Sequence, residues 1–456
     1  MTKPSKHVAP FSQQGLAEEF AAKSQGRLAW DGQKWREWDG RRWIGADVMP
    51  SVVSFAKQQT KKSTDPDRKD RMLSHNFLKD IGKLARYEKC IQRRPEDFDA
   101  DPYLLNTPDG IVDLRTGKMN HHDPFKFCSK ITRASPVGHC PTWQRVLEDA
   151  TGGDADLIAF LQRWFGYALT GDTREHAVAF IHGPGGSGKS LVVNAVQRAM
   201  GDYGRALPMS SLMTARNDQH STDLAGLAGF RLVVGTETGA NAAWNESKLK
   251  QITGGDVVSA RLMHRDFVDF KPALKLTLVG NHLPRTASVG RDMQRRLRVV
   301  PFRRSVAVDR VDTRLADKLD AEAGGILAWA VAGAVEWHKT GLGSCAAVQE
   351  ASRRYFADAD VIGRFLADCC VISTGAWAAS SALYVSFGDW CRQNGERQVS
   401  QKAFSADLGG RHGVTKSDRR NARGFSGIAL PEAASTVFRG DFNRVDGDAS
   451  PEGVTH

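Results

Sequence analysis

The sequence predicts an α/β protein built around a parallel sheet with helices on both faces, and three observations support this prediction. Four short apolar runs are typical of buried strands, at residues 177–181, 231–237, 274–281 and 297–302. Segments of helical character separate these runs, as expected of parallel strands joined by helices. A glycine-rich loop, GPGGSGKS at 183–190, follows the first run directly and precedes a helical segment.

The length and composition are those of a multidomain globular protein. The 456 residues exceed what one hydrophobic core normally supports, and hydrophobic residues make up 41% of the chain. A net charge of +11 favours a polyanionic partner such as nucleic acid, although a basic protein without such a partner has the same composition. We find no apolar run of the roughly 20 residues that a membrane helix needs, no signal peptide and no CxxC pair among the seven cysteines. We therefore expect a cytoplasmic protein with no membrane partner.

The N-terminal region combines turn signals with helical segments. A short repeat, WDGQKW at 30–35 and WDGRRW at 38–43, predicts two tight turns between short strands. Helices are expected within residues 50–98, and a short strand at 111–114. The tryptophans could stack on nucleic-acid bases, but their spacing favours packing into a core.

The loop at 183–190 matches GxxxxGKS in the context that a phosphate-binding loop requires, between a strand and a helix. Its glycines allow backbone N–H groups to face phosphates, and the following helix N-terminus adds a favourable dipole. Lys189 can neutralise phosphate charge and the Ser190 hydroxyl can ligate Mg²⁺, so we expect ATP and Mg²⁺ as cofactors. The residues expected to bind the nucleotide are Gly183, Pro184, Gly185, Gly186, Ser187, Gly188, Lys189, Ser190 and Leu191.

Polar side chains end the second and third apolar runs. Glu237 stands where such an ATPase needs a carboxylate to hold hydrated Mg²⁺ or to polarise the attacking water. Its neighbour is Thr236 rather than a second acid, which leaves its role open between general base, metal partner and both. Asn281 could hold the attacking water, although an Asn at a strand end is most often a turn former. We expect Lys189, Glu237 and Asn281 to be catalytic, with Ser190 and Glu237 at the metal.

A run of arginines follows, RDMQRRLR at 291–298. Phosphoryl transfer gains from a cation at the γ-phosphate, and ring ATPases often supply it from the neighbouring subunit. Arg295, Arg296 and Arg298 are the candidates, although most surface arginines have no such role. We retain Arg295 and Arg296 as catalytic candidates.

The segment between Glu237 and Asn281 predicts a helix, a Gly-Gly stop and a β-hairpin with His264 and Arg265 near its tip. A basic tip beside an aromatic residue suits contact with nucleic acid, whereas a solvated basic hairpin is the alternative. The residues expected to contact DNA are Lys248, Arg261, His264 and Arg265.

The order of these motifs resembles superfamily 3 helicases of the phage/plasmid primase–helicase family, which includes the poxvirus NTPase. The matching segments are GPGGSGKS at 183–190, VVGTETG at 233–239, KLTLVGNHLPR at 275–285, RRLRVVPF at 295–302 and, upstream, NTPDGIVDLRTGKMNHHDP at 106–124. The resemblance implies an AAA+-like P-loop NTPase core in a homo-hexameric ring. It also implies translocation on single-stranded or forked DNA, with the phage, plasmid or integrated element replicating in the cytoplasm of a bacterial host.

The resemblance also assigns roles to individual residues. Lys189 and Ser190 fall on the Walker A positions, and Glu237 falls on Walker B. Asn281 falls on the sensor motif. The arginine-finger positions are those of Arg295 and Arg296, and the DNA-contacting hairpin is that of His264 and Arg265.

Longer members of the family carry a primase domain before the part that this sequence matches. Residues 1–100 are too short for one and hold no convincing catalytic acid cluster or zinc motif, so we expect primase activity either in a separate primase or polymerase partner or not at all. The histidines and cysteines between 121 and 140 have a spacing that fits no standard zinc cluster. Residues 384–408 resemble the family's winged-helix segment, and the basic run 416–423 could touch phosphates; a helical cap on the ring is the alternative.

The sequence thus predicts an AAA+-like core with a small N-terminal α+β domain and a C-terminal winged-helix-like module. The expected segments are a disordered tail at 1–15, the N-terminal domain at 16–140, the ATPase at 141–345, the C-terminal module at 346–435 and a flexible tail at 436–456. The expected function is an ATP-dependent DNA helicase or translocase. The alternatives are a DNA-stimulated ATPase that loads or remodels replication complexes, and a DNA-binding initiator that uses ATP as an assembly switch.

Overall fold

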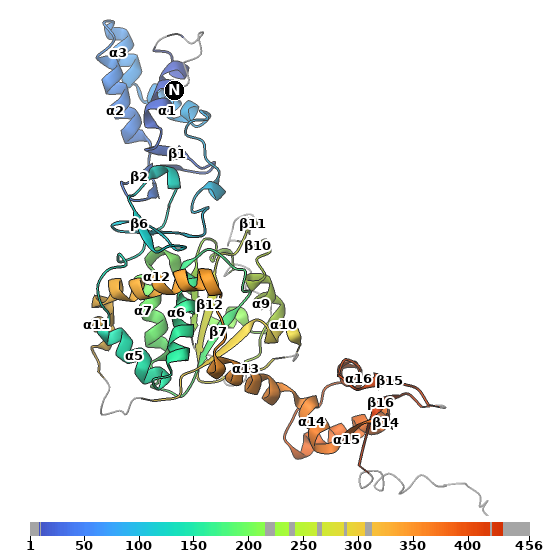
Figure 1. The fold of residues 1–456 in the computed structure, drawn as a ribbon. Helices are drawn as coiled ribbons and strands as arrows, with labels where there is room; N and C mark the ends of the chain where they lie inside the picture. The colour runs from blue at the N-terminus through green and yellow to red at the C-terminus, as the bar shows by residue number, and fades with distance from the viewer. Residues whose placement is uncertain are drawn as a thin grey trace, which may run out of the picture. The chain divides into compact units, whose positions relative to one another are not determined.

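A computed structural model describes most of the chain (Figure 1). The described residues are Ala9 and residues 11–214, 224–236, 242–261, 267–286, 290–305, 312–419 and 422–431. They form two compact units, Met1–Ser352 and Arg353–His456, which we describe separately. Within these ranges, no helix is both long and apolar enough to cross a bilayer.

The centre of the first unit is a five-stranded parallel sheet with the strand order β13-β7-β12-β9-β8. Its strands are β7 (Val178–His182), β8 (Gly204–Ala206), β9 (Leu232–Thr236), β12 (Lys275–Gly280) and β13 (Leu297–Pro301). The four apolar runs of the sequence are four of these strands, and the parallel α/β prediction is confirmed. Strand β8 was not predicted, because its three residues are polar or small and two of them are exposed at the sheet edge.

Helices cover both faces of this sheet (Figure 1). On one face lie α6 (Ala155–Leu169), α7 (Lys189–Ala199) and α12 (Ala323–Thr340), and on the other lies α9 (Glu246–Thr253). Trp164 of α6 donates from its indole Nε1 to Thr277 Oγ1 of β12 at 2.9 Å, and both residues are fully buried. On the α9 side, the Phe180 ring contacts Trp244 with centroids 5.9 Å apart. The remaining helices of this region are α5 (Pro141–Thr151), α10 (Arg291–Gln294), α11 (Leu315–Ala321) and α13 (Ala346–Ala359).

The tryptophan-rich repeat forms a three-stranded antiparallel sheet, as the sequence predicts. Its strands are β1 (Leu28–Trp30), β2 (Trp35–Trp38) and β3 (Trp43–Gly45). Asp31 Oδ1 accepts from the backbone N–H groups two and three residues further on, at 3.0 and 2.8 Å. Asp39 repeats this turn, with both distances at 2.8 Å. The paired rings lie 5.6 Å apart in the first hairpin and 6.0 Å apart in the second, so the tryptophans pack against one another.

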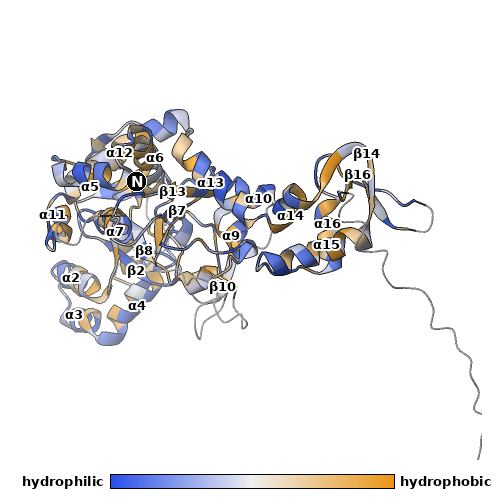
Figure 2. Cartoon of the chain, turned by 90° about the horizontal axis from the view of Figure 1, so that it is seen from below, coloured by the Kyte–Doolittle hydropathy of each residue, from blue (hydrophilic) through white to orange (hydrophobic). Residues whose placement is uncertain are grey.

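Helices and a second small sheet complete the N-terminal part of this unit. The helices are α1 (Gln13–Ser24), α2 (Met49–Thr60), α3 (Pro66–Leu73) and α4 (His75–Ala85), and the strands are β4 (Leu104–Thr107), β5 (Gly110–Asp113) and β6 (Lys118–Asn120). The chain is already helical at Gln13, within the tail expected to reach residue 15. The reason is an N-cap, because Ser12 Oγ accepts from the Gly15 N–H at 3.1 Å. Figure 2 shows the amphipathic helices of this unit with apolar and polar residues on different sides.

The described residues of the second unit form the end of α13, three further helices and a three-stranded antiparallel sheet of order β14-β16-β15. Its elements are α14 (Val361–Cys369), β14 (Val371–Ala379), α15 (Ser380–Gln393), α16 (Gln401–Leu408), β15 (Thr415–Lys416) and β16 (Gly424–Ala429). This succession of helix, strand, two helices and a β-hairpin is winged-helix-like. Phe387 stacks on Phe404 at the centre of the unit, with ring centroids 4.7 Å apart. The tail expected at 436–456 lies outside the described residues.

Candidate functional site

The glycine-rich loop connects β7 to α7 at the carboxyl edge of the sheet. Gly188 is the N-cap of α7 with φ of +79°, a conformation that residues with a Cβ rarely adopt. Gly183 lies so close to the end of β13 that a Cβ there would be 1.9 Å from the Phe302 carbonyl oxygen. The loop therefore requires glycine at its base and at the start of the helix for two different reasons.

The Lys189 side chain lies inside this loop. Its Nζ donates to the carbonyl oxygens of Gly183 at 2.8 Å and Pro184 at 2.6 Å, and to Ser187 Oγ at 3.1 Å. Lys189 is only 6% exposed, and this burial lowers the pKa of its side chain. Phosphate oxygens could take the place of these neutral oxygens and would compensate the buried charge better. The loop thus fits a phosphate chain.

A cavity of about 480 Å³ brings the loop together with the end of β12. It is lined by residues 185–191 and 279–282, so Asn281 lies beside the loop. The carboxyl ends of parallel strands meet at one edge, which is where ligands bind in open α/β sheets. Ser190 is exposed at this cavity and could ligate a metal ion there. Glu237 lies outside the described residues; β9 ends before it at Thr236, which pairs with Val279 of β12.

Two residues that sequence reasoning did not single out also contact this site. His182 ends β7, and its Nε2 donates to the Asn281 backbone carbonyl at 3.1 Å. Burial lowers the pKa of His182, and the Lys189 charge acts in the same direction. Ser305 Oγ donates to the Gly185 carbonyl at 3.0 Å. The position of His182 directly before the loop was a usable signal, whereas nothing in the sequence marked Ser305.

The arginine run lies at the amino ends of the parallel strands, whereas the glycine-rich loop lies at their carboxyl ends. Arg295 and Arg296 directly precede β13, whose first residue pairs with Val178 and whose last pairs with His182. This pairing covers four residue steps, or about 13 Å along the strands. The arginines line a different cavity, of about 700 Å³, whose lining residues are Glu175, His176, Lys250, Gln251, Gly254, Asp256, Arg295, Arg296 and Arg298. Within one chain, the structure therefore does not bring the arginine run to the phosphate loop.

The arginines differ in exposure. The Arg295 side chain is 65% exposed and pairs with Asp292 at 3.0 Å. Arg296 is buried and donates to the Asp292 carbonyl at 3.2 Å, while its Nε has no hydrogen-bond partner among the described residues. Burial lowers the pKa of Arg298, which reaches the Gln294 carbonyl at 3.4 Å. Of these three arginines, Arg295 is the exposed one, Arg298 is half-buried and Arg296 is buried.

The predicted β-hairpin is confirmed. β10 (Val258–Arg261) pairs antiparallel with β11 (Phe267–Phe270), and the hairpin follows α9. Arg261 ends β10, and His264 and Arg265 lie outside the described residues. Lys248 is half-buried in the first turn of α9, where its backbone N–H donates to the Asn245 side chain at 3.1 Å. The four expected DNA contacts thus come from two consecutive elements, α9 and the hairpin segment.

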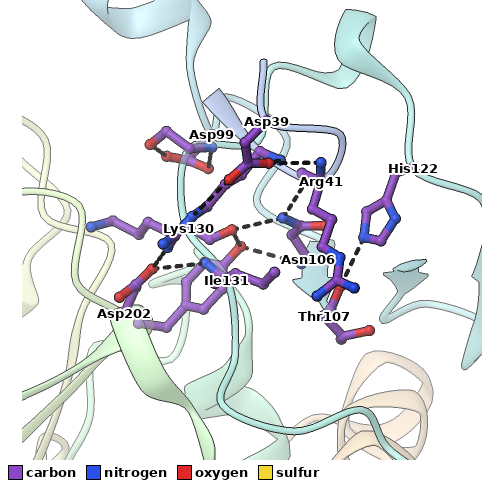
Figure 3. Close-up of polar contacts among 12 residues, drawn as sticks. Asp39, Arg41, Asp99, Asn106, Thr107, His122, Lys130, Ile131 and Asp202 are labelled. Carbon is purple, nitrogen blue, oxygen red and sulfur yellow. Dashed lines mark hydrogen bonds and ion pairs between the residues drawn. The ribbon is translucent and has the colours of Figure 1, made fainter. Parts of the chain in front are cut away.

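The far end of α7 is connected to the N-terminal repeat (Figure 3). Asp202, just beyond α7, accepts from the Ile131 N–H at 3.1 Å and forms an ion pair with Arg42 in the second turn of the repeat. Asn106 Nδ2 donates to the carbonyls of Arg41 and Lys130, both at 2.9 Å. The helix that begins at the phosphate loop is therefore fixed at its other end by the N-terminal region.

Comparisons with known proteins agree with this architecture. Residues 14–152 match the family described as D5 N terminal like, and residues 181–296 match a family of unknown function, DUF5906. The putative helicase L207/L206 of Acanthamoeba polyphaga mimivirus is 24% identical over 325 residues, which are 65% of this chain and 34% of that protein. The putative helicase 022R of Frog virus 3 is 23% identical over 262 residues, which are 53% of this chain and 27% of that protein.

Solved structures show the same fold. The apo structure of the NrS-1 C-terminal region superposes with a TM-score of 0.52 at 12% identity, over 92% of this chain and all of that chain. This chain spans only about a quarter to a third of the length of the viral relatives it matches. The two matched families, the helicase-named relatives and the shared fold agree with the order of motifs around the phosphate loop. Residues 14–152 thus match the D5 N terminal like family and residues 181–296 match DUF5906, and both matches support the predicted resemblance to the phage-type superfamily 3 primase–helicase family.

Proposed function

We propose that this chain is an ATP-dependent DNA helicase or translocase that acts in the replication of a phage, plasmid or integrated element. One observation carries the proposal. The residues expected to be catalytic lie in two groups, at opposite ends of the parallel strands. Lys189 and Asn281 lie at one edge and Arg295 at the other, in separate cavities. A cation from a second copy is needed to complete such a site, as in ring ATPases.

In this proposal, ATP lies between adjacent copies of a homo-hexamer. The loop N–H groups and Lys189 hold the β- and γ-phosphates, and Asn281 positions the attacking water. Ser190 and Glu237 hold Mg²⁺, which would neutralise charge on the phosphates. Arg295 of one copy then reaches the γ-phosphate held by its neighbour. Its exposure favours it over Arg296, whose guanidinium is buried against Asp292.

DNA would contact the β10–β11 hairpin. Hydrolysis around the ring would move the hairpins, which carry His264 and Arg265, along one strand. Replacing both residues with Ala should spare basal ATP turnover and weaken single-stranded DNA binding. A loss of basal turnover in this variant would place the two residues in the nucleotide site instead.

A subunit-mixing experiment tests the shared site. Lys189→Ala and Arg295→Ala should each abolish ATP turnover when assayed alone. Mixed in equal amounts, they should regain about a quarter of wild-type turnover, because one interface in four then combines an intact loop with an intact arginine. Arg296→Ala is the matched comparison, and we expect it to lower the melting temperature because its side chain is buried. If Arg295→Ala alone retains ATP turnover, or if the mixture of the two assembled variants regains none, the shared site with Arg295 is wrong.

A forked-duplex assay separates a helicase from an ATPase that loads or remodels. Wild-type protein should displace the labelled strand only with ATP and Mg²⁺. ATP turnover that is stimulated by single-stranded DNA but never displaces a strand would refute the helicase and favour the loader. No turnover at all would favour the initiator.

A further inference from the structure

His182 ends β7 at the point where the glycine-rich loop begins, and its backbone is held by the strands on both sides. It pairs with Gly280 of β12 and with Pro301 of β13. Its carbonyl also accepts from the Phe302 N–H at 2.7 Å. The half-buried imidazole therefore starts from a fixed point beside the loop.

The hydrogen bond from this imidazole has a defined direction. A backbone carbonyl oxygen can only accept, so the bond of 3.1 Å to Asn281 requires the hydrogen on Nε2 of His182. Burial is the largest influence on the pKa of His182 and lowers it, whereas the bond to Asn281 opposes this shift. The charges of Lys189 and His282 lower the pKa further. The neutral ring with its hydrogen on Nε2 is therefore the form present at neutral pH.

The bond from His182 restrains the residue that follows β12. The ladder between β12 and β7 ends where Gly280 pairs with His182, and Asn281 comes next, exposed at the cavity beside the loop. The carbonyl and the side chain of Asn281 are joined through one Cα, so holding the carbonyl limits where the side chain can point. This restraint matters because a group that orients a reacting molecule must be placed to within about 0.5 Å.

His182 itself does not line this cavity. Among the described residues, those around the cavity are 185–191 and 279–282. The imidazole is therefore placed to act on a ligand there through Asn281, the residue with which its side chain forms a hydrogen bond.

We propose that His182 is a positioning residue, which orients the Asn281 amide toward the attacking water by holding the Asn281 backbone carbonyl. This inference rests on the proposed ATP hydrolysis, in which Asn281 positions that water. Loss of the bond should slow the chemical step, because the water is then less well placed. It should leave nucleotide binding intact, because the glycines of the loop, Lys189 and Ser190 are unchanged.

Steady-state ATP turnover of the full-length protein, with single-stranded DNA and saturating Mg²⁺, tests the proposal with two substitutions of His182. In His182→Gln, the amide nitrogen lies as many bonds from Cα as Nε2 does in histidine, so it can still donate to the carbonyl. In His182→Asn, the amide lies closer to the backbone and cannot reach. We expect His182→Asn to lower kcat about tenfold, with the KM for ATP changed by less than about twofold. His182→Gln should retain at least about half of the wild-type kcat, because the donor is kept.

A double variant separates a positioning role from a purely structural one. Because His182 acts through the Asn281 side chain, His182→Asn should cost nothing further once Asn281→Ala has removed that side chain. The double variant should therefore turn over ATP at the rate of Asn281→Ala alone. Losses that multiply would show that His182 acts elsewhere, and they would overturn the proposal.

His122→Asn is the matched control. The Nε2 of His122 also donates to a backbone carbonyl, that of Thr107 at 2.9 Å, and the ring is also half-buried, but it lies in the N-terminal region (Figure 3). We expect His122→Asn and His182→Asn to lower the melting temperature by similar amounts, since each loses one such bond, whereas only His182→Asn should lower kcat.

Unchanged kcat in His182→Asn, an equal loss of kcat in His122→Asn, or no recovery in His182→Gln would overturn the proposal. A failure of the proposed ATP hydrolysis would be seen before any substitution of His182, as wild-type protein without ATP turnover. A failure of the role of Asn281 would be seen as full turnover in Asn281→Ala alone.

Discussion

Substitution of Gly183 by alanine tests whether backbone contact between the phosphate loop and β13 sets the geometry of the site. A Cβ at this position would be 1.9 Å from the Phe302 carbonyl oxygen and 2.9 Å from its carbon. Real Cβ contacts are essentially never shorter than 3.0 Å, so the loop or the strand end must move by at least 1.1 Å, the difference between 3.0 and 1.9 Å. Neither neighbour can yield by rotating a side chain, because the contact is with backbone.

A misplacement of about 1 Å at a reacting centre costs on the order of 100-fold in rate. We therefore expect Gly183→Ala to lower ATP turnover by about 100-fold, measured as phosphate release with saturating Mg²⁺. Gly45→Ala is the control outside the site, since a Cβ there meets only the end of the Lys34 side chain at 3.9 Å and its backbone is not in the left-handed region. If Gly183→Ala turns over ATP at the wild-type rate, or Gly45→Ala is equally damaged, the reasoning is refuted.

Three further predictions concern the elements that support the two units. Thr277→Val should lower the free energy of unfolding by about 1–3 kcal/mol, because the buried Trp164 N–H loses its acceptor; equal stability in denaturant titration would contradict this. Asp31→Ala should cost about 1–2 kcal/mol more than Asp39→Ala, because only Asp31 is buried and paired with Arg36; equal losses would show that the turn alone matters. Burial raises the pKa of Asp360, but hydrogen bonds from Arg411 and the Gly363 N–H outweigh it, so the net pKa is lowered. Its contribution to the free energy of unfolding is therefore present above about pH 4 and lost as the pH falls through the lower pKa of the folded state. Asp360→Asn should have a lower free energy of unfolding at neutral pH and should lose less of it on acidification. Parallel pH profiles of stability would refute the assignment.

Local patterns were sufficient to predict most of the elements. The four buried strands could be predicted from the sequence, because strands covered on both faces are apolar at nearly every position. The WDG repeat is readable because an Asp-Gly turn is satisfied by its own neighbours, as the bonds to Asp31 and Asp39 show. Strand β8 was not readable, since three short edge residues carry no periodic signal.

Motif order also predicted which residues lie together at the carboxyl ends of the parallel strands. The loop and Asn281 share one cavity because both follow parallel strands that are neighbours in the sheet. From the sequence, three arginines are equally good candidates for the cation at the γ-phosphate, since no local pattern distinguishes Arg295, Arg296 and Arg298. Exposure distinguishes them, and exposure depends on how the segment before β13 packs against its surroundings.

By itself, then, the sequence determined the fold class and the place of the glycine-rich loop, because each depends on residues close together in the chain. Only the tertiary structure decided how the start of that loop is held. The Gly183 contact with Phe302 and the His182 bond to Asn281 join segments about 100 residues apart or more. Only the tertiary structure placed the arginine run at the opposite edge of the sheet from Lys189. Strand direction and register separate them, and these are fixed by pairing between β7 and β13 that no local pattern encodes.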